Sequence, residues 1–484
     1  MIMIKINNWI NGEERKPRDN NWINKINPHT GQADSMFADS NKEDIEEAVS
    51  CAKETFPNWS NLTPVERGSL LFGFVQEMKN CSVQLADCVS KETGKSTKDA
   101  FGEVQGAIAQ GEFFAGEGRR LYSRSLTSGT PGKYSHTVRC PLGVAGLIVP
   151  ANTPIANIAW KIFPALICGN TVVLKASEDS PEIAMLIARI SKDSGLPDGV
   201  LNVVQGEGNS AGNPLVESED VDVISFTGST SVGKIIASRV GARMGRVSLE
   251  LGGKNPLVIC SDADIENAIN WCSLSAFSNA GQRCASGSKL IIFEDIYDEF
   301  KEKMIKKSLS LKLGIDNSSD LGPVMNKKQF LNIMSSIENA EKQGGIVLCG
   351  GNKSSQPGLA DGFYIEPTLI EGLDENSELS CNEIFGPVAS LHKVKNLNEA
   401  INLSNGTQYG LTAAIHTKDV DSAILFSHSV RAGVVNVNAG TYGSEPHMPF
   451  GGFGASGNGT REPGVEALDV YSEIKNISMI LNAR

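Results

Sequence analysis

One cysteine of this chain lies in a stretch that suits a nucleophile. Cys284 closes Ser278-Asn-Ala-Gly-Gln-Arg-Cys284, in which Gly281 and its polar neighbours predict a loop directly after a helix. The thiolate is the reactive form of cysteine, and Arg283 or the helix end would lower the thiol pKa. The other nine cysteines lie mostly in helical or strand patterns. For Cys284 the alternative is an inert buried thiol like those.

A carboxylate ends an apolar strand some thirty residues before this loop. Glu250 stands near the end of the apolar stretch 246–251 and precedes a Gly-Gly turn. Ligands bind at the carboxyl ends of parallel strands. Burial there would raise the pKa of Glu250 toward the working range of a general base. The alternative is an ion pair with Lys254.

An asparagine ends another expected strand. Asn152 lies in Pro150-Ala-Asn152-Thr-Pro154, and its side-chain amide suits donation to an oxyanion. The default alternative is an Asx turn before proline.

Two glycine-rich stretches suit a phosphate. Gly206-Glu-Gly208, followed by Gly212, differs from a dinucleotide fingerprint by one extra residue. The stretch from Phe226 to Gly233 ends a strand and opens a helix, whose first amides would hold a phosphate. In both cases the alternative is an ordinary turn between strand and helix.

The elements that must position these residues alternate between strand and helix. Amphipathic helices are expected across residues 43–57 and 63–120, and an exposed hairpin across 121–140. From Gly143 onward the alternation predicts parallel sheets covered by helices. A first series of strands is expected at 143–149, 171–176, 200–205, 222–226 and 246–251, and a second at 256–260, 289–293, 345–349, 413–417 and 433–438.

Composition limits the class of protein. The 484 residues carry 44 Lys and Arg against 56 Asp and Glu, a net charge of -12 without a basic stripe, which argues against nucleic-acid binding. The most apolar stretch, 143–174, contains Asn152, Asn157, Lys161 and three prolines, so no membrane span is expected. No cysteine or histidine spacing indicates a metal site. Scattered cysteines are typical of reduced thiols in the cytoplasm.

Taken together, four motifs resemble those of the NAD(P)-dependent aldehyde dehydrogenase superfamily. They are ELGGKNP (250–256), NAGQRC (279–284), EIFGPV (383–388) and PFGG (449–452), and the similarity extends over essentially the whole chain. The resemblance implies an α/β, aldehyde dehydrogenase-like fold. Its parts would be a Rossmann-like cofactor domain (1–120 and 141–252), an α/β catalytic domain (253–446) and a β oligomerisation arm (121–140 and 468–484). A homodimer or homotetramer is expected.

The same resemblance implies roles for individual residues. Cys284 corresponds to the nucleophile, Glu250 to the general base, Asn152 to the oxyanion donor, and Lys161 to a lysine that assists proton movement. The expected cofactor is NAD, with NADP still possible, because Glu178 would bond the ribose 2′-hydroxyl and repel a 2′-phosphate. The residues expected around the cofactor are Lys175, Ser177, Glu178, Gly208, Gly212, Phe226, Gly228, Ser229, Gly233, Leu251, Glu383 and Phe385.

The implied reaction is oxidation of an aldehyde to its acid. The Cys284 thiolate adds to the carbonyl, the thiohemiacetal loses hydride to the nicotinamide, and Glu250 activates the water that hydrolyses the thioester. No metal is needed. Three alternatives are a thiol hydrolase with a histidine base, a non-catalytic homologue, and a dehydrogenase that passes the acyl group to coenzyme A.

The substrate is expected to be a small polar aldehyde, such as a semialdehyde. Ala151 stands where the family often has Trp, and Thr153 and Asn157 replace apolar residues of its substrate tunnel. Arg283 adds a positive charge beside the nucleophile. A long alkyl chain would leave such groups unpaired, which is costly. The alternative is that these side chains bond to the protein itself.

Overall fold

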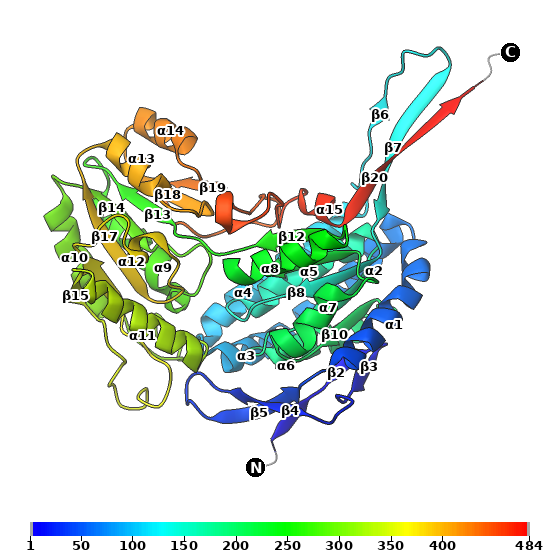
Figure 1. The fold of residues 1–484 in the computed structure, drawn as a ribbon, viewed down its shortest axis with the longest axis horizontal. Helices are drawn as coiled ribbons and strands as arrows, with labels where there is room; N and C mark the ends of the chain where they lie inside the picture. The colour runs from blue at the N-terminus through cyan, green and yellow to red at the C-terminus, as the bar shows by residue number, and fades with distance from the viewer. Residues whose placement is uncertain (1–2, 482–484) are drawn as a thin grey trace.

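The computed structural model describes residues 3–481 and contains two α/β units, each built on a seven-stranded sheet (Figure 1). A thin three-stranded arm projects from one unit, and a second small sheet lies near the N-terminus. The chain crosses between the large units after β12 and returns through the segment that follows β19, so residues from both units meet in the middle.

The first large sheet has the strand order β12-β11-β8-β9-β10-β2-β3. Its five later strands are parallel, and β2 and β3 add an antiparallel edge. The order of the parallel strands reverses between β8 and β11, and such switch points form ligand crevices at the carboxyl ends of strands. The strands are β2 (Asn8–Ile10), β3 (Glu13–Arg15), β8 (Val144–Ile148), β9 (Thr171–Lys175), β10 (Leu201–Val204), β11 (Val223–Thr227) and β12 (Arg246–Glu250).

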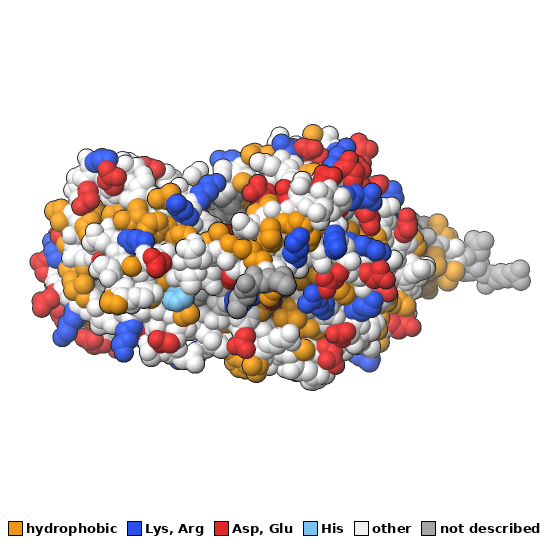
Figure 2. Space-filling model, turned by 90° about the horizontal axis from the view of Figure 1, so that it is seen from below, with side chains coloured by type: hydrophobic (Ala, Val, Ile, Leu, Met, Phe, Trp, Pro, Cys, Tyr) orange, Lys and Arg blue, Asp and Glu red, His pale blue; other side chains and the backbone are white. Residues whose placement is uncertain are grey.

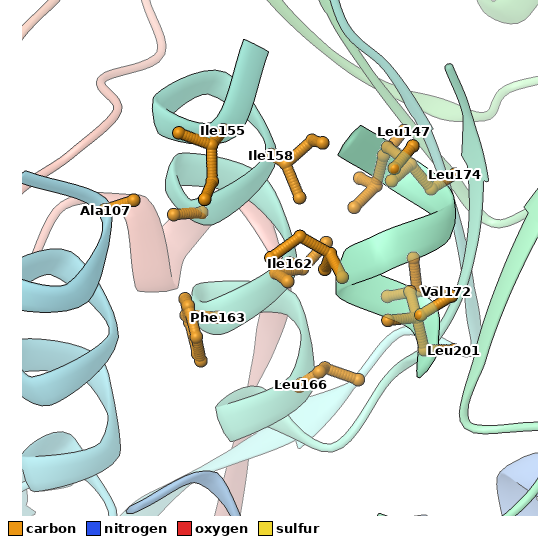
Figure 3. Close-up of a cluster of buried hydrophobic side chains, with 14 of the residues drawn as sticks. Ala107, Leu147, Ile155, Ile158, Ile162, Phe163, Leu166, Val172, Leu174 and Leu201 are labelled. Atoms are coloured by element: carbon orange, nitrogen blue, oxygen red, sulfur yellow. The ribbon is translucent and has the colours of Figure 1, made fainter. Parts of the chain in front are cut away.

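Helix α5 (Pro154–Cys168) covers one face of this sheet. Its side chains Ile158, Ile162 and Leu166 point toward the side on which Leu147, Leu174, Val172 and Leu201 of the sheet lie (Figure 3). Each such side chain, fully buried, contributes about 1.5–3 kcal/mol to stability. The other helices of this unit are α1 (Lys42–Ser60), α2 (Pro64–Asn80), α3 (Ser82–Thr93), α4 (Thr97–Glu117), α6 (Pro181–Asp193), α7 (Asn213–Glu217) and α8 (Thr230–Ala242).

The second large sheet has the order β15-β16-β17-β14-β13-β18-β19 and is parallel except for β15. Its strands are β13 (Pro256–Ile259), β14 (Lys289–Phe293), β15 (Ile346–Cys349), β16 (Thr368–Glu371), β17 (Val388–Val394), β18 (Thr412–His416) and β19 (Val434–Val437). Helices α9 (Ile265–Phe277), α10 (Tyr297–Ser310), α11 (Lys327–Lys342), α12 (Glu378–Cys381), α13 (Leu397–Asn405) and α14 (Val420–Ser429) belong to it.

The arm joins the expected hairpin to the C-terminal strand. Strands β6 (Ser125–Leu126), β7 (Lys133–Pro141) and β20 (Ser472–Ile480) form one antiparallel sheet in the order β20-β7-β6. The strand expected from residue 468 begins only at Ser472, because α15 (Ala467–Val470) precedes it. The expected strand and the first expected domain also include residues 482–484 and 1–2, which lie outside the described residues.

The sequence analysis missed the strands near the N-terminus. Besides β2 and β3, these are β1 (Ile4–Ile6), β4 (Trp22–Ile26) and β5 (Ala33–Ala38). Strands β1, β2 and β3 have only three residues each and are too short to show a period. Strand β2 also pairs with a distant partner, Val203 of β10 opposite Trp9, so only the tertiary fold creates it.

The surface mixes charges of both signs. On the face seen in Figure 2, basic and acidic side chains alternate without a continuous basic stripe. Among residues 3–481, no helix combines the length and apolar character that crossing a bilayer would require.

Candidate active site

The loop that carries Cys284 begins with a left-handed turn. Helix α9 ends at Phe277, and Asn279 (φ 55°), Ala280 (φ 53°) and Gly281 (φ 67°) follow in the left-handed region. A side chain at Gly281 would collide with the backbone oxygen of Gly386. Glycine is therefore required there, and the turn directs the chain back toward the first unit.

Asn255, from the ELGGKNP motif, holds this loop. Its Nδ2 donates to the backbone oxygens of Cys284 and Ser286, both at 2.8 Å, and its Oδ1 accepts from the amide of Thr412. Gly253 lies so close to the Cys284 backbone that an added Cβ would be 2.8 Å from its oxygen. The two motifs that the sequence analysis paired therefore lie against each other.

Glu250 ends β12 and is buried beside this loop. Neither carboxylate oxygen has a hydrogen-bond partner among residues 3–481. Burial raises the Glu250 pKa well above its ordinary value, and the nearby Glu462 raises it further. The alternative of an ion pair with Lys254 is wrong for the described residues, where the Lys254 ammonium makes no hydrogen bond.

Lys161 lies on α5 in a buried polar network behind Glu250. Its ammonium donates to Glu462 Oε2 at 2.8 Å and to Ser225 Oγ at 2.6 Å. Glu462 also accepts hydrogen bonds from Ser225 and Ser248. The sequence analysis missed Glu462. A single glutamate in a turn-rich segment belongs to no recognisable motif, and only the tertiary fold brings it to Lys161.

The surroundings of Cys284 keep its thiol protonated. Burial raises the Cys284 pKa to about 12, and the negative charges of Glu383 and Glu250 add to this effect. The expectation that Arg283 lowers this pKa is wrong. The Arg283 guanidinium donates to Ser278 Oγ at 2.8 Å and stacks on the Tyr442 ring, with 4.6 Å to the ring centre.

Asn152 lies beside the nucleophile loop. Its Nδ2 donates to the backbone oxygen of Gln282 at 2.9 Å, and its Oδ1 accepts from Asn157 at 3.4 Å. These two bonds orient the amide with its nitrogen toward the loop. The Asx-turn alternative is not supported, because the recorded donor to Asn152 Oδ1 is Asn157 and residue 154, two positions on, is a proline without an amide hydrogen.

Thr153 and Asn157, expected to face the substrate, bond chiefly to each other. Asn157 Nδ2 donates to both the backbone oxygen and the Oγ1 of Thr153, each at 2.9 Å. Asn157 is buried, and its amide group is thus partnered without a substrate. The hydrogen bonds of this pair support the alternative, in which these side chains bond to the protein itself.

The residues expected around the adenosine half of the cofactor gather after the ends of β9 and β10. Lys175 is buried with its ammonium 3.2 Å from Glu178, whose Oε1 also accepts from the amide of Gly208 at 3.0 Å. Ser177 is buried in the turn after β9. Gly208 begins a single π-helical turn, which ends at the buried Gly212.

The phosphate-binding candidate is the start of α8. Ser229 is exposed at the N-cap of this 13-residue helix. Gly228 packs against the Phe226 ring and Gly233 against Leu251 so closely that a Cβ at either glycine would collide. An open helix N-terminus behind a close-packed glycine turn suits a pyrophosphate, so the residues fit a dinucleotide.

Glu383 lies against the Gly252-Gly253 turn and near Cys284, and Phe385 follows it by two residues. Glu383 Oε1 accepts from the amide of Gly253 at 3.2 Å, and burial raises the Glu383 pKa to about 7. Phe385 has a positive φ of 55°. Gln329 donates to the backbone oxygens of Ile384 at 2.8 Å and of Phe385 at 3.2 Å, which secures this conformation.

Comparisons with known proteins agree with this geometry. The sequence model described as "Aldehyde dehydrogenase family" matches residues 15–477. The chain is 36% identical to an alpha-ketoglutaric semialdehyde dehydrogenase of Bacillus subtilis, over 97% of each chain. It is 35% identical to aldehyde dehydrogenase, cytosolic 1, of Rattus norvegicus, over 98% of this chain and 95% of that protein.

A solved structure shares the whole fold. Betaine aldehyde dehydrogenase of Staphylococcus aureus in complex with NAD+ superposes with a TM-score of 0.97 at 30% identity, covering 99% of this chain and 96% of that one. This similarity confirms the fold class expected from the motifs.

Proposed function

Because the chain belongs to the aldehyde dehydrogenase family, whose enzymes oxidise aldehydes with NAD or NADP, we propose that Cys284 is its nucleophile and Glu250 its general base. The observation that carries this assignment is the burial of an unpaired Glu250 carboxylate beside the loop of Cys284. A buried carboxylate with a raised pKa is a stronger base than an exposed one and is suited to take a proton from water.

In this proposal the thiol of Cys284 first loses its proton to solvent, and the resulting thiolate attacks the aldehyde carbon. Asn152 and the backbone amide of Cys284 stabilise the oxyanion that forms. When bound, NAD supplies the acceptor for the hydride that leaves the aldehyde carbon. A thioester then remains on Cys284, and Glu250 deprotonates the water that hydrolyses it to the acid. Lys161 and Glu462 offer the proton a route away from Glu250, since both lie in the network behind it.

Replacing the nucleophile tests this mechanism. Cys284→Ala should abolish aldehyde oxidation and leave NAD binding intact, because the side chain contributes nothing to the proposed cofactor crevice. NADH formation measures aldehyde oxidation, and the quenching of protein fluorescence by NAD measures cofactor binding. Substantial turnover by this variant would overturn the assignment.

The proposed division of labour follows the two sheets. The first unit (1–120 and 141–252) binds the cofactor and the second (253–446) carries the nucleophile, with Glu178 favouring NAD over NADP. Support comes from the position of Glu178, which is 40% exposed at the edge of the crevice with only the Lys175 ammonium as an ionic partner among the described residues.

For the substrate, we propose a small aldehyde with a carboxylate or other polar group at its far end. Thr153 and Asn157 satisfy each other, so the support now rests on Arg283. It is partly exposed next to Cys284 and forms no ion pair among the described residues. A relative of this chain is named as a semialdehyde dehydrogenase. Specificity constants for succinic semialdehyde, glycolaldehyde, benzaldehyde and hexanal test this proposal, and a preference for hexanal or benzaldehyde would contradict it.

Assembly and location are also proposals. The arm carries exposed apolar side chains, among them Tyr134, Ile474 and Ile480, which support its expected role in a homodimer or homotetramer. All ten cysteines are free, which supports a cytoplasmic location. Sedimentation of the full chain and of a variant lacking residues 472–484 tests the proposed assembly.

A further inference from the structure

A buried ion pair near the proposed active site has no part in the chemistry described so far. Lys95 precedes α4 and Glu103 lies on it, with the ammonium 2.6 Å from Glu103 Oε2. Both side chains are only 6% exposed. Exposed ion pairs contribute little to stability, and a buried one has a large desolvation cost. The position of the Lys95–Glu103 pair therefore indicates a role other than stabilisation of the fold.

Each partner makes a second contact, and these contacts hold the backbone of Asn152 and the helical turn that follows it. Lys95 Nζ donates to the backbone oxygen of Asn152 at 3.0 Å. Glu103 Oε1 accepts from the amides of Ile155 at 3.1 Å and Ala156 at 3.3 Å, in the first turn of α5. A carboxylate is favourable at a helix N-terminus.

Glu103 supplies the cap that α5 lacks. The N-cap residue of α5, Thr153, makes no capping hydrogen bond with its side chain. The start of α5 is thus held from α4, by the same carboxylate that fixes the Lys95 ammonium.

The backbone of Asn152 is also tied to the nucleophile loop. Its oxygen accepts a second hydrogen bond, from Asn279 Nδ2 at 3.0 Å, while its own side chain donates to Gln282. Lys95 and Asn279 therefore both donate to the backbone oxygen of Asn152. Together they fix the backbone from which the Asn152 side chain projects. A donor to a developing oxyanion is effective only when it is held in place beforehand.

We propose that Lys95 and Glu103 are positioning residues that hold Asn152 in register with Cys284. This inference rests on the proposed function, in which Asn152 stabilises the oxyanion. Neither residue touches the reacting atoms, so each acts through Asn152.

The test is a double-mutant cycle on the rate constant of the first-turnover NADH burst. Asn152→Ala alone should lower that rate constant by about 10²–10³-fold, the usual loss for one oxyanion donor. Lys95→Met should lower it by about 10–100-fold in the wild type, because a misplaced group costs up to about 10²-fold. In the Asn152→Ala background, Lys95→Met should lower the burst rate constant by less than about 2-fold.

Two variants serve as controls. Lys95→Arg retains a charged donor and should recover most of the burst rate, which loss of general stability would not predict. Lys91→Met removes a more exposed pair with Glu182, 38% and 33% exposed at 2.7 Å, on the neighbouring helix α3. It should leave the burst rate unchanged in both backgrounds.

Equal losses from Lys95→Met in the two backgrounds, or no loss in either, would overturn the positioning role. No loss from Asn152→Ala itself would overturn the oxyanion role of Asn152 and the inference with it. If Lys95→Met does not fold, Glu103→Gln replaces it, since glutamine still accepts from the α5 amides but no longer pairs with Lys95. The same dependence on Asn152 is expected, with a loss of about 3–10-fold in the wild type.

Discussion

Replacing Glu250 by glutamine separates the two halves of the proposed reaction. Glutamine has nearly the same volume but cannot take a proton from water, so thioester hydrolysis should become rate-limiting. General bases contribute about 10²–10⁴-fold. Because neither Glu250 oxygen has another partner among residues 3–481, we expect the loss of this whole contribution, about 3–5 kcal/mol in the barrier of the second half-reaction.

The first half-reaction should survive this substitution. The Glu250 charge raises the Cys284 pKa, so its removal does not disfavour the thiolate. The fold should survive as well, since Glu250→Gln removes a buried charge next to Glu462. Unfolding should occur at an unchanged or higher temperature.

Stopped-flow absorbance of NADH provides the assay. Glu250→Gln should give a burst close to one NADH per active site, followed by a nearly flat phase, whereas the wild type should continue to turn over. A surface substitution, Glu266→Gln, is the matched control, because its carboxylate pairs with Lys303 far from the site. Unchanged steady-state turnover would refute the role of Glu250, and loss of the burst itself would place Glu250 in the first half-reaction.

The pH dependence of the wild type follows from the same carboxylate. A base with a raised pKa is lost by protonation as the pH falls through that value. Steady-state turnover should therefore decline on the acidic side, above the ordinary range for glutamate. In Glu250→Gln the residual turnover should lack this decline, and an acidic limb that persists would belong to another group.

Three further predictions concern the cofactor, the substrate and the thiol. Glu178→Gln should raise kcat/KM for NADP relative to NAD, because it removes the charge that repels a 2′-phosphate; an unchanged ratio would show that Glu178 does not discriminate. Arg283→Met should raise KM for succinic semialdehyde by about 10-fold or more, the worth of one charged hydrogen bond, with little effect on hexanal. Equal effects on both would exclude a carboxylate contact. Without NAD, alkylation of Cys284 by iodoacetamide should accelerate through pH 10 without a plateau, since the pKa is raised to about 12. Glu383→Gln should speed the alkylation above pH 7, where Glu383 is charged. A plateau of the wild-type rate near pH 8 would contradict the raised pKa of Cys284.

Local sequence was sufficient for the residue types of the site and for most elements of the two sheets. The strand expected at 171–176 is β9, and the helix expected at 43–57 is α1, because apolar runs and amphipathic periods are local signals. The motif around Glu250 and the motif around Cys284 lie together through Asn255. Their resemblance to family motifs predicted that meeting, whereas composition and periodicity did not.

Burial at the end of a strand predicted the direction of the Glu250 pKa shift, whereas the electrostatics around Cys284 and the partners of Glu250 were decided only by the tertiary structure. Arg283 precedes Cys284 in sequence and so was expected to lower its pKa, yet burial and two distant carboxylates raise it. Lys254, four residues from Glu250, was the alternative to a general-base role as an ionic partner, but Glu250 forms no ion pair with it among the described residues and lies near the Lys161–Glu462 network instead. Burial and long-range contacts set the charge of a buried group, and a linear sequence contains neither until the chain has closed on itself.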